Sequence, residues 1–159
     1  MMQAVIMAGG KGTRLAALTK DEIPKPMVPV AGKPLLLWQV ERLKENGITD
    51  IIMVIGHLGN KIREYFGDGE KFGIAIRYFE ETEPLGTAGS FYYLKDMIHG
   101  DRFVMMSGDL FFDIDFQRMI HFHEEKGAVA TLFVHPNGHP FDSDLLVLDK
   151  DDKITAFDS

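Results

Sequence analysis

The chain has 159 residues, with 17 lysine and arginine residues against 24 aspartate and glutamate residues and a formal net charge of −7 at pH 7. The length predicts one domain with enough apolar content to form a core. The acidic balance argues against a nucleic-acid or membrane surface, and no apolar stretch approaches the ~20 residues that a membrane span requires. Cysteine is absent, which excludes disulfides and thiolate zinc sites. Because no signal-like segment opens the chain, we expect a soluble, cytoplasmic protein.

Strand and helix patterns alternate along the chain. Continuous apolar runs such as 51–55 are typical of strands buried on both faces, and Leu36, Val40 and Leu43 recur at helical spacing. The patterns predict strands over 3–7, 50–56, 74–80, 102–106, 128–134, 145–148 and 154–157, the last two joined as a hairpin. They predict helices over 35–46, 59–66, 87–98 and 115–126.

Repeated strand–helix–strand units predict an α/β fold, and specifically a Rossmann-like three-layer α/β/α arrangement with a mostly parallel, mixed sheet. We expect residues 1–159 to form a single domain. Sheets of this kind bind ligands beyond the carboxyl ends of their strands. The loops that carry Gly9, Glu81 and Asp109 each follow a predicted strand, so we expect them to meet at one edge of the sheet.

The first predicted strand ends directly in glycines, in the run Met-Ala-Gly-Gly-Lys-Gly-Thr-Arg-Leu over 7–15, and Pro-Lys-Pro follows over 24–26. Glycine adopts φ > 0 and lets backbone N–H groups approach a ligand closely. Lys11, Arg14 and Lys25 place positive charge around this turn, which favours a phosphate ligand. Neither the P-loop spacing nor the dinucleotide-binding fingerprint is present.

The complete string, G-x-G-T-R-L followed by P-K-P, resembles the signature of the sugar-phosphate nucleotidylyltransferases. Further segments match the family in the same order, at 30–34, 81–89 and 107–109. The Met-Ala-Gly-Gly and Pro-Leu-Gly-Thr-Ala-Gly runs look most like the guanylyltransferases that make GDP-mannose or GDP-heptose. Family members continue past the position of Ser159 with a lysine for the sugar phosphate and a second metal-binding aspartate. The resemblance therefore implies a nucleotidyltransferase domain that is truncated at its C-terminus, and we expect this chain to bind nucleotide but to catalyse poorly.

The resemblance implies transfer of a nucleoside monophosphate from a nucleoside triphosphate to a sugar 1-phosphate, with release of pyrophosphate and with Mg²⁺ as cofactor. Arg14 would hold the pyrophosphate, Lys25 would neutralise charge on the α-phosphate, and Asp109 would bind the metal. The nucleotide-binding residues implied by the family pattern are Ala8, Gly9, Gly10, Gly12, Thr13, Arg14, Glu81, Gly86, Thr87 and Gly108. The sequence does not determine the sugar, or whether copies of the chain form a homo-oligomer.

Glu81 lies five residues before Gly86, where relatives recognise the nucleobase. Guanine presents two adjacent donors, N1–H and the N2 amino group, which one carboxylate can accept together. Uracil and thymine present a donor and acceptors, which suit an amide better. Glu81 therefore favours GTP. Glu80 and Glu83 lie close to it in the sequence, so the sequence does not settle which of the three glutamates occupies the base-recognition position.

Three other functions remain open at this point. The chain could be a uridylyl-, cytidylyl- or thymidylyltransferase of the same family, or a non-catalytic regulatory subunit that binds a sugar nucleotide. Asp113 and Asp115 also form the D-x-D motif of many glycosyltransferases, although Asp115 is better interpreted as the N-cap of the next helix. In family position, residues 135–144 lie near the sugar pocket, and they lack the Tyr-Gly element common in hexose-using members.

Overall fold

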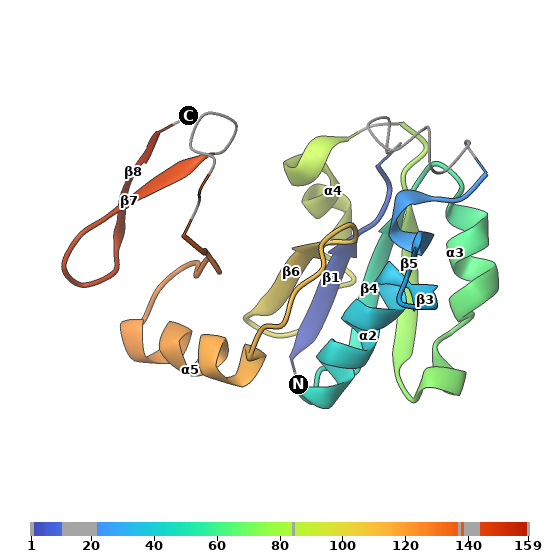
Figure 1. Cartoon of the computed structure of the whole chain (residues 1–159), viewed down its shortest axis with the longest axis horizontal. Coiled ribbons are helices and arrows are strands. Elements are labelled where there is room, and N and C mark those ends of the chain that lie inside the picture. The colour runs from blue at the N-terminus through green and yellow to red at the C-terminus, as the bar shows by residue number, and fades with distance from the viewer. Residues whose placement is uncertain (1, 11–21, 84, 137, 139–143, 159) are drawn as a thin grey trace. The chain divides into compact units, whose positions relative to one another are not determined.

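The computed structural model describes residues 2–10, 22–83, 85–136, 138 and 144–158. The chain folds into two compact units, Met1–Gln117 and Arg118–Ser159. Figure 1 shows the elements in chain order.

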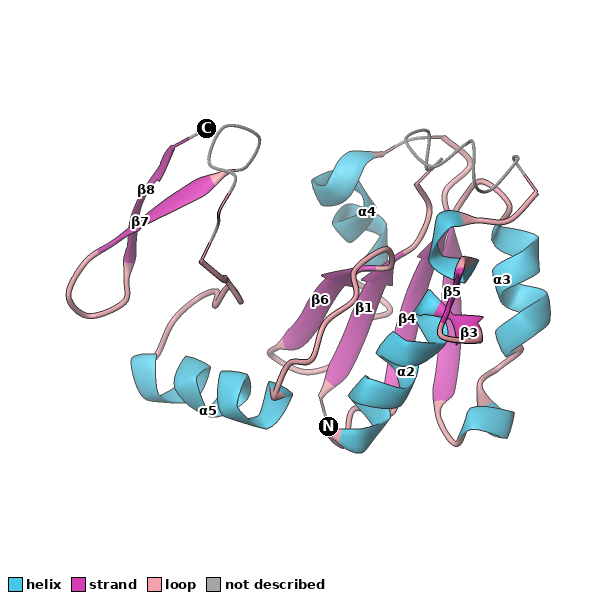
Figure 2. Ribbon diagram, in the orientation of Figure 1, coloured by secondary structure: helices cyan, strands magenta, loops and turns pink. Residues whose placement is uncertain are grey.

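The first unit is built on a four-stranded sheet in the order β5-β4-β1-β6. Its strands are β1 (Gln3–Met7), β4 (Asp50–Ile55), β5 (Ala75–Glu80) and β6 (Phe103–Ser107). Every pairing is parallel, and the central strand β1 aligns Gln3 with Asp50 on one side and with Phe103 on the other. The carboxyl ends of all four strands therefore share one edge (Figure 2).

Helices cover both faces of this sheet. On one face, Leu94 of α4 (Gly86–Leu94) packs in a cluster with Val5, Ile52 and Val54. On the other face, α3 (Gly59–Phe66) meets the side chain of Ile55, and α2 (Leu35–Glu45) crosses in front of the strands (Figure 1). This arrangement confirms the three-layer α/β/α class. No helix in the described residues is long and apolar enough to cross a membrane.

The helix expected over 87–98 ends earlier, at Leu94. The N–H groups of Met97 and Ile98 both bond to the carbonyl of Leu94, so the chain tightens into a turn, and Gly100 follows at φ +90°. The partly buried side chains of Met97 and Ile98 still pack against the core cluster. Their apolar character reflects this packing and not a longer helix.

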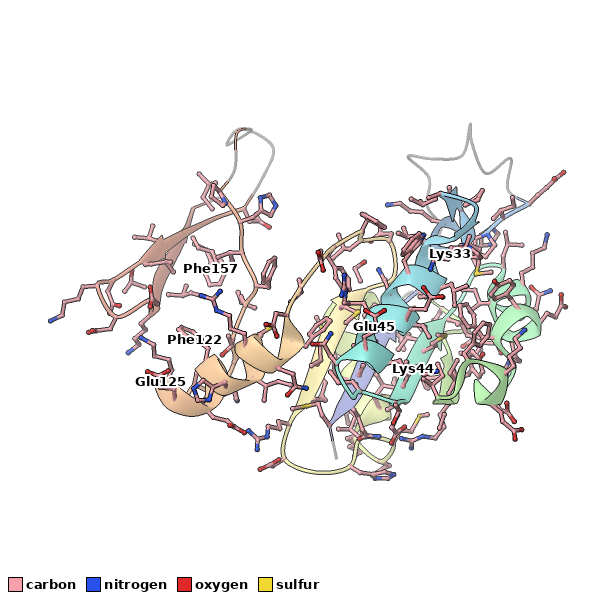
Figure 3. All side chains as sticks on the ribbon, turned by 60° about the horizontal axis from the view of Figure 1, so that its bottom comes forward. Lys33, Lys44, Glu45, Phe122, Glu125 and Phe157 are labelled. Carbon is pink, nitrogen blue, oxygen red and sulfur yellow. The ribbon has the colours of Figure 1, made fainter. Side chains whose placement is uncertain are left out.

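A short antiparallel hairpin precedes α2 and was not expected from the sequence. It pairs β2 (Pro29–Val30) with β3 (Lys33–Pro34), and its turn places Ala31 at φ 49° and Gly32 at φ +87°. The indole N–H of Trp38 donates to the carbonyl of Val30 at 2.9 Å. Figure 3 shows Lys33 at this end of α2 and Lys44 and Glu45 at the other end. The described residues of this unit also form two single-turn 3-10 helices, η2 (Lys25–Met27) and η3 (Glu70–Phe72).

The second unit contains most of α5 (Phe116–Lys126) and the predicted hairpin of β7 (Leu145–Leu148) and β8 (Ile154–Asp158). The strand expected over 128–134 is wrong, because this segment pairs with no strand among the described residues. A strand needs hydrogen-bonding neighbours as well as apolar side chains, and Val129 is fully exposed here. Phe122 (Figure 3), Leu132 and Leu146 line a hollow of about 850 Å³ within this unit.

Candidate active site

Three glycines stand at the carboxyl ends of neighbouring strands: Gly9 after β1, Gly56 after β4 and Gly108 after β6. A Cβ on Gly56 would lie 2.8 Å from the carbonyl oxygen of Gly9 and 3.2 Å from its Cα. A Cβ on Gly108 would lie 3.1 Å from the Cβ of Ala8. None of the three has a positive φ, so the close approach of neighbouring atoms, and not the expected φ > 0, accounts for glycine here, most strictly at Gly56, where the neighbour is backbone.

Backbone hydrogen bonds continue the sheet pairing into these loops. The N–H of Ala8 donates to Val54, that of Glu81 to Ile55 and that of Gly108 to Met7, each at 2.8 Å. Each bond fixes the first residue or two after a strand to the neighbouring strand. The loops after β1, β5 and β6 are therefore held at one edge, as the sequence predicted.

Lys25 and Asp109 form an ion pair at this edge, in which Lys25 Nζ donates to Asp109 Oδ2. The other carboxylate oxygen of Asp109 accepts from Ser107 Oγ at 2.5 Å. Burial of Asp109 disfavours its ionised form, but the hydrogen bonds from Lys25 and Ser107 and the positive charge of Lys25 outweigh it. The pKa of Asp109 is accordingly lowered, and the carboxylate is charged at neutral pH.

The chemistry of Asp109 fits a magnesium ion that arrives with its nucleotide. Mg²⁺ is usually held by one or two carboxylates together with waters and substrate phosphates, and not by an all-protein cage. The described residues contain no cluster of three or more histidine, cysteine, aspartate or glutamate side chains suited to a metal. A single ionised carboxylate beside a lysine therefore suits a shared metal–phosphate site better than a preformed metal centre.

Gln39 braces the turn that carries Asp109. Its side chain is 2% exposed, and Nε2 donates to the carbonyls of Ser107 at 3.0 Å and Leu110 at 2.6 Å. Its Oε1 is buried and has no hydrogen-bond partner among the described residues. Sequence reasoning missed this residue. The available signal was its place on the same helix face as Leu36, Val40 and Leu43, where a polar side chain is expected to be buried.

The carboxylate of Glu81 lies against the glycine turn. Its Oε1 accepts from Ser90 Oγ at 2.5 Å, and its Oε2 lies 2.8 Å from where a Cβ on Gly9 would stand. Glu80 instead forms an ion pair with Arg63 on α3, at 3.3 Å. Glu83 is exposed. Of the three glutamates that the sequence left open, the geometry brings Glu81 to Gly9 and gives Glu80 a different partner.

The structure describes only some of the remaining predicted site residues. Gly12, Thr13 and Arg14, together with Lys11, lie outside the described residues, as do positions 137 and 139–143 of the segment expected near the sugar. Gly86 and Thr87 form the first turn of α4. Within the D-x-D motif, Asp113 pairs with Arg42 on α2, and Asp115 directly precedes α5, where an N-cap is expected.

Residues 3–158 match the model of the nucleotidyl transferase family. The chain belongs to this family. It is 37% identical to the probable mannose-1-phosphate guanylyltransferase 1 of Oryza sativa subsp. japonica, over 98% of this chain and 44% of that protein. It is 44% identical to the D-glycero-alpha-D-manno-heptose 1-phosphate guanylyltransferase of Campylobacter jejuni, over 81% of this chain and 57% of that protein. The chain thus spans about half the length of these relatives.

The family's solved structures share the fold. A crystal structure of a putative glucose-1-phosphate thymidylyltransferase from Bacillus anthracis, in complex with a sucrose, superposes with a TM-score of 0.87 at 27% identity. The match covers 99% of this chain and 63% of that one. Members named for guanylyl and for thymidylyl transfer are therefore both similar to this chain, so family membership alone does not determine the nucleobase.

Proposed function

We propose that this protein transfers GMP from GTP to a sugar 1-phosphate, mannose or heptose 1-phosphate, and forms a GDP-sugar with release of pyrophosphate. The observation that carries the choice of GTP is the Glu81 carboxylate beside Gly9, at the edge where the parallel strands end. The family match supports nucleotidyl transfer as the reaction class.

In this reaction a phosphate oxygen of the sugar 1-phosphate attacks the α-phosphorus of GTP. The bond from the α-phosphorus to the bridging oxygen breaks, and pyrophosphate leaves. Such transfers need positioning and charge neutralisation more than covalent help from the protein. Lys25 supplies a positive charge for the α-phosphate, and Arg14 supplies a guanidinium for the pyrophosphate oxygens. Mg²⁺ held by Asp109 would add further neutralisation of the phosphate charge.

The choice of base rests on hydrogen-bond chemistry. A carboxylate accepts from both N1–H and the N2 amino group of guanine, and it offers no donor to the carbonyl oxygens of uracil or thymine. The rice and Campylobacter relatives are both named as guanylyltransferases. A pyrimidine nucleotide is the second candidate, favoured by the likeness to the Bacillus anthracis structure.

Nucleotide binding to the 159-residue chain, measured by calorimetry with GTP, UTP, CTP and dTTP in the presence of Mg²⁺, tests the proposal. We expect GTP to bind most tightly. Glu81→Gln places a donor opposite a guanine N–H, so GTP affinity should fall roughly 5- to 150-fold, corresponding to about 1–3 kcal/mol. Glu80→Gln is the matched control, because Glu80 pairs with Arg63, and it should leave GTP affinity unchanged. A wild-type preference for a pyrimidine nucleotide would remove the guanylyl assignment and keep the broader one.

A further inference from the structure

We infer that Ser90 is a positioning residue for base selection: its hydroxyl sets the plane of the Glu81 carboxylate and so determines how well that carboxylate accepts both guanine donors. This inference rests on the proposed function. It concerns a residue on α4 that acts through Glu81 and not by contact with the nucleotide.

The first support is that Glu81 is fixed at both ends. Its backbone N–H donates to Ile55 at the end of β4, at 2.8 Å. Its side chain accepts from Ser90 Oγ at 2.5 Å, and Ser90 is fully buried, at 0% exposure. A carboxylate that lacked the second contact could turn about its last side-chain torsion, which is broad in energy. The buried hydroxyl removes that freedom, since hydrogen bonds to a charged acceptor are the stronger ones.

The second support is the space on the other side of the carboxylate. Oε2 lies where a side chain at Gly9 would otherwise stand, since a Cβ there would be 2.8 Å away. Gly9 thus leaves room for Oε2, while Ser90 holds Oε1. A carboxylate has about four lone-pair positions, so Oε1 can accept from Ser90 and still accept from a ligand. Gly9, Glu81 and Ser90 therefore act as one unit that presents two acceptors at a fixed angle.

The consequence for recognition is specific to two-donor bases. GTP offers N1–H and the N2 amino group, whereas inosine triphosphate (ITP) offers N1–H alone. A carboxylate with a fixed plane gains more from the second donor than a rotating one, because it is already aligned before the ligand binds. Loss of the Ser90 hydroxyl should therefore weaken GTP binding more than ITP binding, and should leave UTP binding nearly unchanged.

The experiment measures dissociation constants of GTP, ITP and UTP for the 159-residue chain and its variants by calorimetry with Mg²⁺. In Ser90→Ala we expect the GTP constant to rise roughly 3- to 20-fold and the GTP-to-ITP preference to shrink by a similar factor. Ser107→Ala is the matched control. It removes another hydroxyl at this edge that donates a hydrogen bond to a carboxylate, here the carboxylate of Asp109, and it should weaken the binding of GTP and of ITP equally. In a Glu81→Gln background, Ser90→Ala should have no further effect on the ratio, as expected for a residue that acts through Glu81.

Ser90→Cys keeps nearly the same volume with a weaker donor, and it carries the test if the alanine variant melts at a lower temperature. A smaller GTP-to-ITP preference in either variant supports the inference. An unchanged preference in both variants, with GTP still bound in preference to UTP, overturns the inference alone. Absence of GTP binding by the wild-type chain overturns the proposed function and this inference together.

Discussion

The two ends of the same parallel sheet are built in opposite ways. At the amino end, polar side chains bond to one another across strands. Asp50 accepts from Gln3 at 2.8 Å and from Arg77 at 3.1 Å, and Arg77 also donates to the carbonyl of Met97 at 2.9 Å. The backbone N–H of His99 donates to Gln3, which is 1% exposed. These groups use their hydrogen-bonding capacity within the protein.

At the carboxyl end, glycines without side chains follow three of the strands instead. Gly9, Gly56 and Gly108 let the backbones approach, and among the described residues Glu81, Lys25 and Asp109 place charged side chains near them. At the amino end the polar groups bond to one another, whereas at the carboxyl end backbone groups and charged side chains remain able to bind a ligand. Topology alone therefore does not make a binding edge: the composition of the residue or two after each strand does.

Among the substitutions at the carboxyl end of the sheet, Asp109→Ala should have the largest effect on activity. Under the proposed function, Mg²⁺-dependent nucleotidyl transfer is lost, while the fold remains, because Asp109 is partly exposed and lies in a turn. Metal-free nucleotide binding should tighten, since a negative charge beside the phosphates is gone. The rate of pyrophosphate release, measured as a function of Mg²⁺ concentration, checks this prediction. Unchanged Mg²⁺ dependence, with its loss in Asp113→Ala instead, would move the metal to the D-x-D motif.

Lys25→Ala should lower the rate of pyrophosphate release by about 10²-fold, the scale of losing one preorganised charge stabiliser. Arg14→Ala should act on the same scale. Thermal stability should hardly change, since the side chain of Lys25 is 28% exposed and outside the core. Lys33→Ala is the control: Lys33 pairs with Glu41 and lies 3.4 Å from the Trp38 ring centroid, so its loss should spare the rate. A near-normal rate in Lys25→Ala would remove Lys25 from the mechanism.

Gly56→Ala should lower both stability and nucleotide affinity. The new Cβ meets the backbone of Gly9 at 2.8 Å, so one strand end must move, at a cost of about 1–3 kcal/mol in unfolding free energy. Gly10→Ala is the matched control for stability, because a Cβ there would have no atom of the described residues within 4 Å. Urea denaturation of both variants measures the difference. Equal stability of the two would mean that the backbones do not approach this closely in solution.

Gln39→Leu should loosen the turn that carries Asp109, and its effect on Mg²⁺ dependence should be smaller than that of Asp109→Ala. The substitution removes the donor to Ser107 and Leu110 and also removes the unpaired Oε1, so stability should change little. The Mg²⁺ concentration needed for nucleotide binding should rise about 10-fold, as expected when a supporting hydrogen bond behind a metal ligand is lost. Metal-free nucleotide affinity is the internal control and should stay constant. A large loss of stability with no shift in Mg²⁺ dependence would make Gln39 purely structural.

Asp50→Ala tests the other end of the sheet and should leave the ligand site untouched. It deprives Gln3 and Arg77 of their acceptor, so unfolding free energy should fall by about 1 kcal/mol. GTP affinity should match the wild type. Asp101→Ala removes a carboxylate whose side chain is 91% exposed, and should change neither quantity. A weaker GTP affinity in Asp50→Ala would show that the two ends are coupled.

The sequence predicted the parts of this molecule that depend on local pattern. The strands β1, β4 and β6 follow from continuous apolar runs, and the meeting of the loops at Gly9, Glu81 and Asp109 follows from parallel pairing. The prediction of a strand over 128–134 was wrong because apolar content indicates burial and does not supply a strand with a hydrogen-bonding neighbour. Gln39 and Ser90 escaped notice because their importance lies in the residues that they contact. Helical spacing indicates that Gln39 is buried, but it does not indicate which groups either side chain contacts.

The contact between Gly9 and Gly56 also limits how this edge can vary. Elsewhere in a core, an enlarged side chain can be offset by a smaller neighbour, but here both partners already have no side chain. A side chain at Gly56 would meet backbone atoms of Gly9, so it can be accommodated only by moving β1 or β4, whose residues form the centre of the core. Random mutagenesis followed by selection for folding should therefore recover almost no replacements at Gly56, and no substitution at Gly9 that compensates for one, while Gly10 accepts small residues freely.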